Sequence, residues 1–385
     1  MKYQKWLLAI IGLTASTIHA LPSTRRGSYP DPNAPQHLEK YDFDDFEDVD
    51  SADLVKRDLT TQYNAELPQG SISRPRTAPP FHAPYTYVFD ESAGDGTFVY
   101  VIDTGFSTIT PAYQKLVHEP QWIIPTFTPN NWDNLKNDPT DHGTCVGSLV
   151  AAYSYGIAKR TTLVIVKVSD KLDQKGDIRN FLEGLDLTIE DIQRKLQRDP
   201  KLKGKIFINL SRGRFRAAMH RLNAMTMIFA AAGNAVSRAP EPQNRQLQSY
   251  PQLWHNELPN MMIVGMATPA GHRSAGSYFP LQEVYGPFPM ASGKTTWGTS
   301  LAAPQAAGLA AYIAGLPEKP KGFPDPLEDF DGYVDAMKTQ LRLDSWIRPE
   351  SKKGNPKPEA VPLISNQLQN HCKGRALDLC RCAII

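Results

Sequence analysis

The stretch Val-Ile-Asp-Thr-Gly, residues 101–105, closes an apolar run that starts at residue 97 and has the composition of a buried strand. Similar runs follow it at residues 162–168, 205–210, 225–231 and 261–266. Helical stretches separate them, after His142, at 177–198, at 216–224 and after Ser300. Strands that alternate with helices predict an α/β fold, with a doubly wound, mostly parallel sheet and helices on both faces. Asp103 then falls at the carboxyl end of a strand, where ligands bind in such sheets.

Three short motifs carry the residue types that acyl-transfer chemistry needs. Asp103 lies in the first, His142 in Asp-His-Gly-Thr at 141–144, and Ser300 in Gly-Thr-Ser-Leu-Ala-Ala-Pro at 298–304. A serine hydroxyl is a poor nucleophile at neutral pH, so it needs a histidine to take its proton and a carboxylate to hold that histidine. Together the motifs predict a catalytic triad of Asp103, His142 and Ser300.

A fourth motif, Ala-Ala-Gly-Asn at 231–234, meets the need of an acyl-transfer site for fixed donors to an oxyanion. The residues before it form a run typical of a buried strand, and Gly233 permits a turn. Asn234 follows at the end of that strand with a side-chain amide that can donate a hydrogen bond. We expect Asn234 to form an oxyanion hole together with the backbone N–H of Ser300.

The order Asp, His, Ser with these neighbours resembles the subtilisin-like serine peptidase family, and the nearer likeness is to its secreted fungal members. The likeness extends over residues 98–315. It implies a subtilisin-like fold and a serine endopeptidase that hydrolyses peptide bonds through an acyl-enzyme. It also implies that an extended peptide pairs with the strand Ile-Asn-Leu-Ser-Arg-Gly at 208–213. The substrate-binding residues that it predicts are Ser211, Arg212, Gly213, Ala231, Ala232 and Gly233.

Several features leave alternatives open. The rival function is a catalytically silent secreted protein of the same fold, which binds peptides without cutting them. Asp141, beside His142, is expected to cap the helix that follows; alternatively its carboxylate raises the pKa of His142. Cys145 is expected to be a small buried residue. Many family members bind structural calcium; this sequence shows no assignable set of oxygen ligands, so a structural calcium is left open, and no other metal or cofactor is predicted.

Composition divides the chain into segments. The first segment, residues 1–20, has a charged start, a short apolar centre and a small residue at its end, which is the plan of a secretory signal. The second holds eight acidic residues and one lysine between Glu39 and Asp53 and ends at the dibasic pair Lys56-Arg57, which resembles a processing site. We expect secretion, with a vacuolar location as the alternative, and cleavage after Arg57. The predicted segments are a signal peptide at 1–20, an acidic leader at 21–57, a Pro-rich linker at 58–80, a catalytic domain at 81–316 and a C-terminal extension with a Cys-rich end at 317–385.

Charge and composition narrow the partners. The formal net charge of +2 predicts no nucleic-acid binding, and no stretch is long and apolar enough for a membrane span. We expect a monomer that acts on proteins or peptides. Asn209 heads the only glycosylation sequon and is expected to stay unmodified, because it lies in the predicted substrate strand. One or two disulfides are predicted in a secreted chain, with the pairing left open among Cys145, Cys372, Cys380 and Cys382.

Overall fold

The structure is a computed structural model, and the residues that it describes belong to the part of the chain spanning residues 51–385. They are residues 59–74, 85–108, 116–126, 137–170, 178–211, 215–234, 247, 249–268, 272–274, 277, 284–287, 298–347, 362–363 and 365–366. Several predicted features lie outside them, namely the signal peptide, the acidic leader, Lys56-Arg57, Arg212, Gly213, Cys372, Cys380 and Cys382.

A mostly parallel sheet forms the centre of the described residues, as predicted. The strand order is β10-β11-β9-β8-β7-β6-β3-β5-β4, and every neighbouring pair is parallel except β10 with β11. The five predicted strands are β3, β5, β6, β7 and β8, each within one or two residues of its expected bounds. The strands are β3 (Phe98–Asp103), β4 (Gln121–Ile123), β5 (Thr162–Lys167), β6 (Ile206–Leu210), β7 (Met227–Ala231), β8 (Met261–Ala267), β9 (Val284–Pro287), β10 (Trp346–Ile347) and β11 (Pro362–Leu363).

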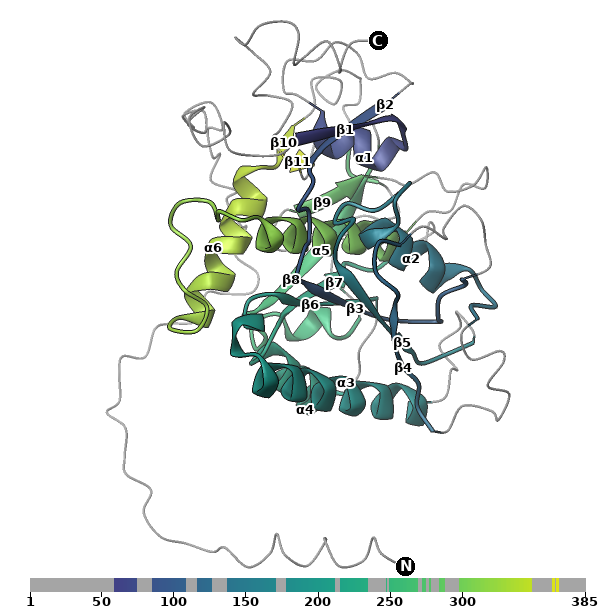
Figure 1. The fold of residues 1–385 in the computed structure, drawn as a ribbon. Coiled ribbons are helices and arrows are strands. Elements are labelled where there is room, and N and C mark those ends of the chain that lie inside the picture. The colour runs from purple at the N-terminus through teal and green to yellow at the C-terminus, as the bar shows by residue number, and fades with distance from the viewer. Residues whose placement is uncertain are drawn as a thin grey trace, which may run out of the picture. The chain divides into compact units, whose positions relative to one another are not determined.

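Helices cover both faces of this sheet (Figure 1), which confirms the doubly wound α/β fold. On one face, α2 (His142–Ala151) and α5 (Thr299–Gly315) contribute to the same apolar cluster as β3 and β7, and α6 (Phe330–Leu343) packs on that cluster. On the other face lie α3 (Ile178–Arg198) and α4 (Arg216–Asn223), with a short 3-10 helix, η5 (Pro200–Leu202), between them in sequence.

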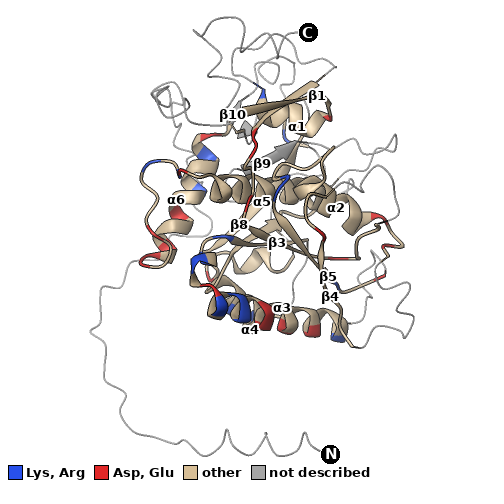
Figure 2. Ribbon diagram, viewed as in Figure 1, with Lys and Arg blue, Asp and Glu red and all other residues tan. Residues whose placement is uncertain are grey.

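The surroundings of each helix explain its composition. Figure 2 shows charged residues along α3 and α4 but none on α2 or α5. The helix α3 is amphipathic: Leu185, Ile189 and Ile192 are buried against the sheet, whereas Leu182 is 39% exposed. In α5 every residue from Leu301 to Ala314 is buried. Because this central helix is covered on all sides, it carries apolar residues around its whole circumference.

The segment predicted as a Pro-rich linker is instead ordered structure over residues 59–74. It forms β1 (Leu59–Ala65) and α1 (Leu67–Ser73), and β1 pairs antiparallel with β2 (Tyr85–Asp90). All seven residues of α1 are buried, and Gln69 Nε2 donates to the carbonyl of Gly156 at 3.0 Å. The linker prediction was wrong here because most side chains buried in α1 are polar or small, so no apolar period marks the helix.

Both ends of the described chain pack against the same body. The backbone N–H of Asp90 donates to the Tyr312 hydroxyl on α5 at 2.8 Å. The backbone N–H of Asn366 donates to the carbonyl of Ile72 at 3.1 Å, and its side-chain amide donates to the carbonyl of Val88 at 2.8 Å. None of the described helices has both the length and the apolar character to cross a membrane.

Lys159, in the loop between α2 and β5, is buried against the β1–β2 ribbon. Its ammonium group donates to Gln62 Oε1 on β1 at 2.7 Å and to the carbonyl of Tyr153. The rings of Tyr87, Phe89 and Tyr153 surround it at 5.1 to 5.3 Å from their centroids. Burial lowers the pKa of Lys159 from 10.5 to about 7. A titratable cation therefore lies where the N-terminal ribbon meets the rest of the domain.

Replacing Lys159 by methionine is expected to flatten the pH dependence of stability between about pH 7 and pH 9. In this range the unfolded wild-type chain binds a proton at Lys159 that the folded chain does not, so the wild-type free energy of unfolding rises by about 1.4 kcal/mol per pH unit. Methionine fills the aromatic surroundings without titrating. Denaturant unfolding across this range measures the slopes, with the exposed Lys201→Met as control. Equal slopes in wild type and Lys159→Met would contradict the prediction.

Candidate active site

The first turns of two helices and the end of one strand bring the three predicted triad residues together. Asp103 is the last residue of β3, His142 the first of α2 and Ser300 the second of α5. His142 Nδ1 lies 2.7 Å from Asp103 Oδ1, and His142 Nε2 lies 3.0 Å from Ser300 Oγ. With the ring proton on Nδ1, directed at Asp103, Nε2 has a lone pair for the proton of Ser300. The geometry is that of a nucleophile, a base and a residue that orients the base.

The helix that carries His142 is capped by a different carboxylate from the one expected. Asp141 precedes α2, but it has a left-handed φ of 59° and makes no side-chain cap hydrogen bond, so the expected cap was wrong. Asp138 takes that role, because its Oδ2 accepts from the backbone N–H of Thr144 at 2.7 Å and from the Thr144 hydroxyl at 2.8 Å. No short-range pattern in the sequence marks Asp138, since a turn separates it from the helix.

Asn234 follows the strand β7, and its side-chain amide has a defined orientation. Asn234 Oδ1 accepts from the backbone N–H of Thr299 at 2.9 Å and from the Thr299 hydroxyl at 3.1 Å. A Cβ added to Gly298 would lie 3.2 Å from Asn234 Nδ2 and equally far from Ser300 Oγ, so these two atoms border one small space. The backbone N–H of Ser300 belongs to the first turn of α5, where helical N–H groups have no acceptor in their own helix. Two donors therefore lie beside the serine oxygen.

The predicted substrate-binding residues end two adjacent strands of the sheet. Ser211 follows β6 and is half-buried, while Ala231 ends β7 and Ala232 is buried beyond it. The backbone turns at Gly233, which has a φ of 97°. Gln252, which no motif indicated, holds the end of β7, because its buried side chain donates to the carbonyl of Ala231.

Asn209, in the only sequon, is fully buried within β6. An oligosaccharide would have no room on this side chain in the folded chain.

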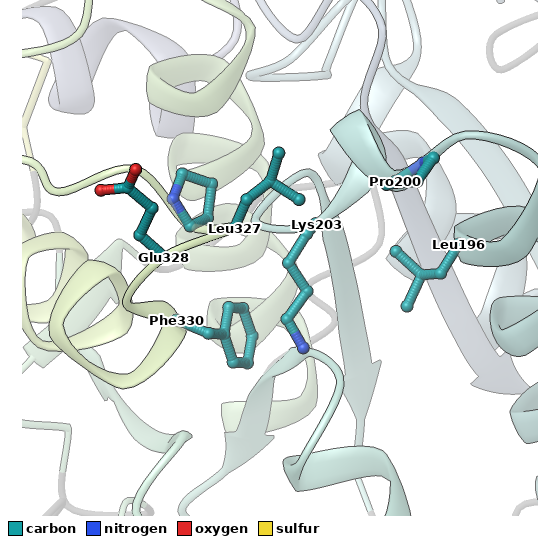
Figure 3. A pocket seen from close by; sticks show the side chains of 7 residues that line it. Leu196, Pro200, Lys203, Leu327, Glu328 and Phe330 are labelled. Atoms are coloured by element: carbon teal, nitrogen blue, oxygen red, sulfur yellow. The ribbon is translucent and has the colours of Figure 1, made fainter.

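Other candidate features lie apart from this site. Cys145 is buried in α2, as expected, and no group of three or more His, Cys, Asp or Glu side chains among the described residues could hold a metal ion. A hollow of about 310 Å³ opens near the carboxyl end of α3 (Figure 3). Lys203, which lines it, lies just before the first residue of β6, so the hollow is at the amino end of that strand. None of the predicted site residues lines it. Its walls are Leu196, Pro200, Lys203, Pro326, Leu327, Glu328 and Phe330.

Comparison with known proteins identifies relatives. Residues 94–323 match the model of the subtilase family. Subtilisin-like protease 4 of Trichophyton equinum is 30% identical over 256 residues, which are 63% of this chain and 59% of that protein. Subtilisin-like serine protease AsES of Sarocladium strictum is 29% identical over 288 residues, 72% of this chain and 68% of the relative. A cold adapted subtilisin-like serine proteinase of known structure aligns at 21% identity with 78% of this chain and 98% of its own, with a TM-score of 0.49. This chain spans less than two thirds of the length of the Trichophyton relative.

Substituting Gly298 by alanine is expected to lower the reactivity of Ser300 in a chain that stays folded. The added methyl group would enter the space between Asn234 Nδ2 and Ser300 Oγ, and a φ of 153° is one that side chains rarely adopt. We expect the rate of labelling by a fluorophosphonate to fall by about 10²-fold, the cost of a small misplacement of reacting groups. Gly322→Ala is the control, because Gly322 also has a positive φ but a Cβ there meets nothing within 4 Å. Unchanged labelling of Gly298→Ala would show that the space is not used.

Proposed function

Because this chain belongs to the subtilase family, we propose that it is a serine endopeptidase that cleaves protein substrates through an acyl-enzyme. The observation that carries the proposal is the pair of hydrogen bonds that join Ser300 to His142 at 3.0 Å and His142 to Asp103 at 2.7 Å. The side chain of His142 is 16% exposed and that of Asp103 only 5%, so the base can be reached from solvent while its orienting carboxylate is protected. That is the arrangement acyl transfer by a serine requires.

In the first half of the reaction, Ser300 Oγ attacks the carbonyl carbon of the scissile peptide bond as its proton passes to His142 Nε2. The carboxylate of Asp103 stabilises the imidazolium that results. The carbonyl oxygen becomes an oxyanion, for which Asn234 Nδ2 and the backbone N–H of Ser300 are the donors. The carbon–nitrogen bond then breaks, and His142 returns the proton to the leaving amine.

In the second half, water replaces the leaving amine. His142 takes a proton from the water, whose oxygen attacks the ester carbon of the acylated Ser300. The same donors hold the second oxyanion. When the ester bond breaks, Ser300 Oγ recovers its proton from His142, and the acid product leaves. Each proton taken up is returned, so the residues are regenerated without a cofactor.

The ends of two strands support a proposed position for the substrate. The residues after β6 and β7, which include Ser211 and Gly233, end at the edge of the sheet where Asp103 lies. An extended peptide that pairs along these ends would present a carbonyl to Ser300 by main-chain hydrogen bonds, with Arg212 and Gly213 as further contacts. We propose further that the enzyme acts outside the cell, because its first residues have the plan of a secretory signal.

The Ser300→Ala variant is expected to lose both peptide hydrolysis and fluorophosphonate labelling while its unfolding midpoint stays close to that of wild type. The substitution removes the nucleophile but little volume. Mass spectrometry of the labelled wild-type protein should place the adduct on Ser300. A wild-type protein that folds but neither labels nor hydrolyses a casein substrate would instead favour the catalytically silent peptide-binding protein.

The secreted protein is expected to begin at Asp58, directly after Lys56-Arg57. The strand β1 starts at Leu59 and pairs with β2, so a cut after Arg57 would remove the acidic leader and leave this ribbon intact. Mass spectrometry of the amino terminus of the secreted protein measures this. An active product that begins near Leu21 would contradict processing at the dibasic pair.

A further inference from the structure

Asp138 is a buried carboxylate that the proposed reaction does not use. It is 3% exposed, yet its pKa is lowered. Burial alone would raise the pKa, but hydrogen bonds from Thr144, Thr104 and Thr140 outweigh that effect. A buried anion held in this way is costly unless its donors are fixed in place. Its position therefore constrains the residues that donate to it.

Asp138 and two of the threonines that donate to it also accept hydrogen bonds from the first backbone N–H groups of α2, the helix that begins with His142. The backbone N–H of His142 donates to Thr140 Oγ1 at 3.2 Å, and that of Gly143 donates to Thr104 Oγ1 at 3.0 Å. The N–H of Thr144 reaches Asp138 directly at 2.7 Å. Both threonine hydroxyls in turn lie near Asp138 Oδ1, at 3.0 Å for Thr140 and 2.8 Å for Thr104. One carboxylate thus organises all three donors of the first turn.

Thr104 also connects Asp138 to Asp103. Its hydroxyl lies 2.8 Å from Asp138 Oδ1 but 3.2 Å from Asp103 Oδ1. A hydroxyl has a single proton to donate, and the shorter distance directs it to Asp138. Asp103 Oδ1 then receives its bonds from the Thr104 backbone N–H and from His142 Nδ1, at 2.8 and 2.7 Å. The ionised form of Asp138 keeps the Thr104 proton away from the oxygen that binds the histidine.

The charged groups around this cluster come from several elements. Lys167 on β5 donates to the backbone carbonyls of Thr104 and Asn137 and pairs with Asp170 at 2.6 Å. Asp103 ends β3, Asp141 is exposed before α2, and Cys145 lies within α2. The amino end of α2 adds a partial positive charge, which opposes a proton on His142 because that residue opens the helix. The negative charge of the buried Asp138 carboxylate offsets this effect of the helix on the protonation of His142.

We propose that Asp138 is a positioning residue of the active site, which acts through the hydroxyl of Thr104 and the first turn of α2 to hold Asp103 and His142 in their reactive arrangement. The proposal rests on the serine endopeptidase function. Asp138 touches no reacting atom, and its effect reaches the reaction through the basicity and orientation of His142.

Asp138→Asn is the sharpest variant, because it keeps the shape but removes the charge. The amide oxygen can still accept from Thr144, while the new NH₂ group donates toward Thr104 and turns the threonine proton toward Asp103. Both changes disfavour a proton on His142. The pH at which reactivity is half-maximal on the acid side should therefore fall, and the maximal rate should fall by about tenfold. A residue that only supports the fold would lower the amount of active protein without moving that midpoint.

The readout is labelling by a fluorophosphonate between about pH 5 and pH 9, with kinact and KI determined at each pH in protein of confirmed fold. We expect a lower kinact for Asp138→Asn, an unchanged KI and a midpoint displaced to lower pH. Asp141→Asn is the comparison variant, because it removes an equal charge from an exposed position beside His142, and Asn accepts its φ of 59°. Asp138→Asn should displace the midpoint further than Asp141→Asn does. An Asp138→Asn midpoint equal to that of wild type would overturn the proposal.

A second pair of variants applies if Asp138→Asn does not fold. Thr104→Ser keeps the hydroxyl, and Thr104→Val removes it with little change of shape. We expect Thr104→Ser to label like wild type and Thr104→Val to show about a tenfold lower kinact with an unchanged KI. A wild-type kinact in Thr104→Val would overturn the proposal. If the wild-type protein labels and these variants do not differ from it, only the role of Asp138 fails; if the wild-type protein does not label, the endopeptidase function fails as well.

Discussion

The parallel pairing of β3 with β5 and β6 is the constraint on which the site depends. Parallel strands end at one edge of a sheet, and the register aligns Asp103 with Lys167 and Ile102 with Leu210. The helices α2 and α5 begin near this edge, since His142 and Ser300 in their first turns contact each other. A helix start supplies side chains and free N–H groups together. One strand end and two helix starts therefore deliver a carboxylate, a base, a nucleophile and a backbone donor to one place.

The four residues of the proposed reaction could be found in the sequence because each lies in a short motif with neighbours that its geometry demands. Gly298 precedes Ser300 because a Cβ would meet both the serine oxygen and Asn234 Nδ2. Asp138 and Gln252 could not be found in this way. Their contacts cross the chain or depend on a left-handed residue, Asp141, whose conformation no local pattern indicates. Residue types predicted the groups in the site, and only the three-dimensional structure reveals what holds them.

The fold shows the same division. The five predicted strands, β3, β5, β6, β7 and β8, are continuous apolar runs buried on both faces, so they could be located to within a residue or two. The helix α1 was not predicted because it buries polar side chains such as Gln69, whose amide donates to the carbonyl of Gly156, 87 residues further along the chain, and so presents no apolar period. The short strands β10 and β11 were missed for a related reason, since two residues each are too few to show a period.

The contact of Asn366 with Ile72 and Val88 has a consequence for the proposed digestion of proteins. A protease is surrounded by copies of itself, and cleavage needs an extended backbone that has left its fold. Here Asn366, in the last described segment, is tied to Ile72 after β1 and to Val88 in β2, and the bond to Val88 joins residues 278 positions apart. Local unfolding of either segment breaks the hydrogen bonds between Asn366 and residues 72 and 88, so this contact opposes the unfolding of both. These hydrogen bonds thus protect the described segments around Ile72 and Asn366 against cleavage by other copies of the proposed enzyme.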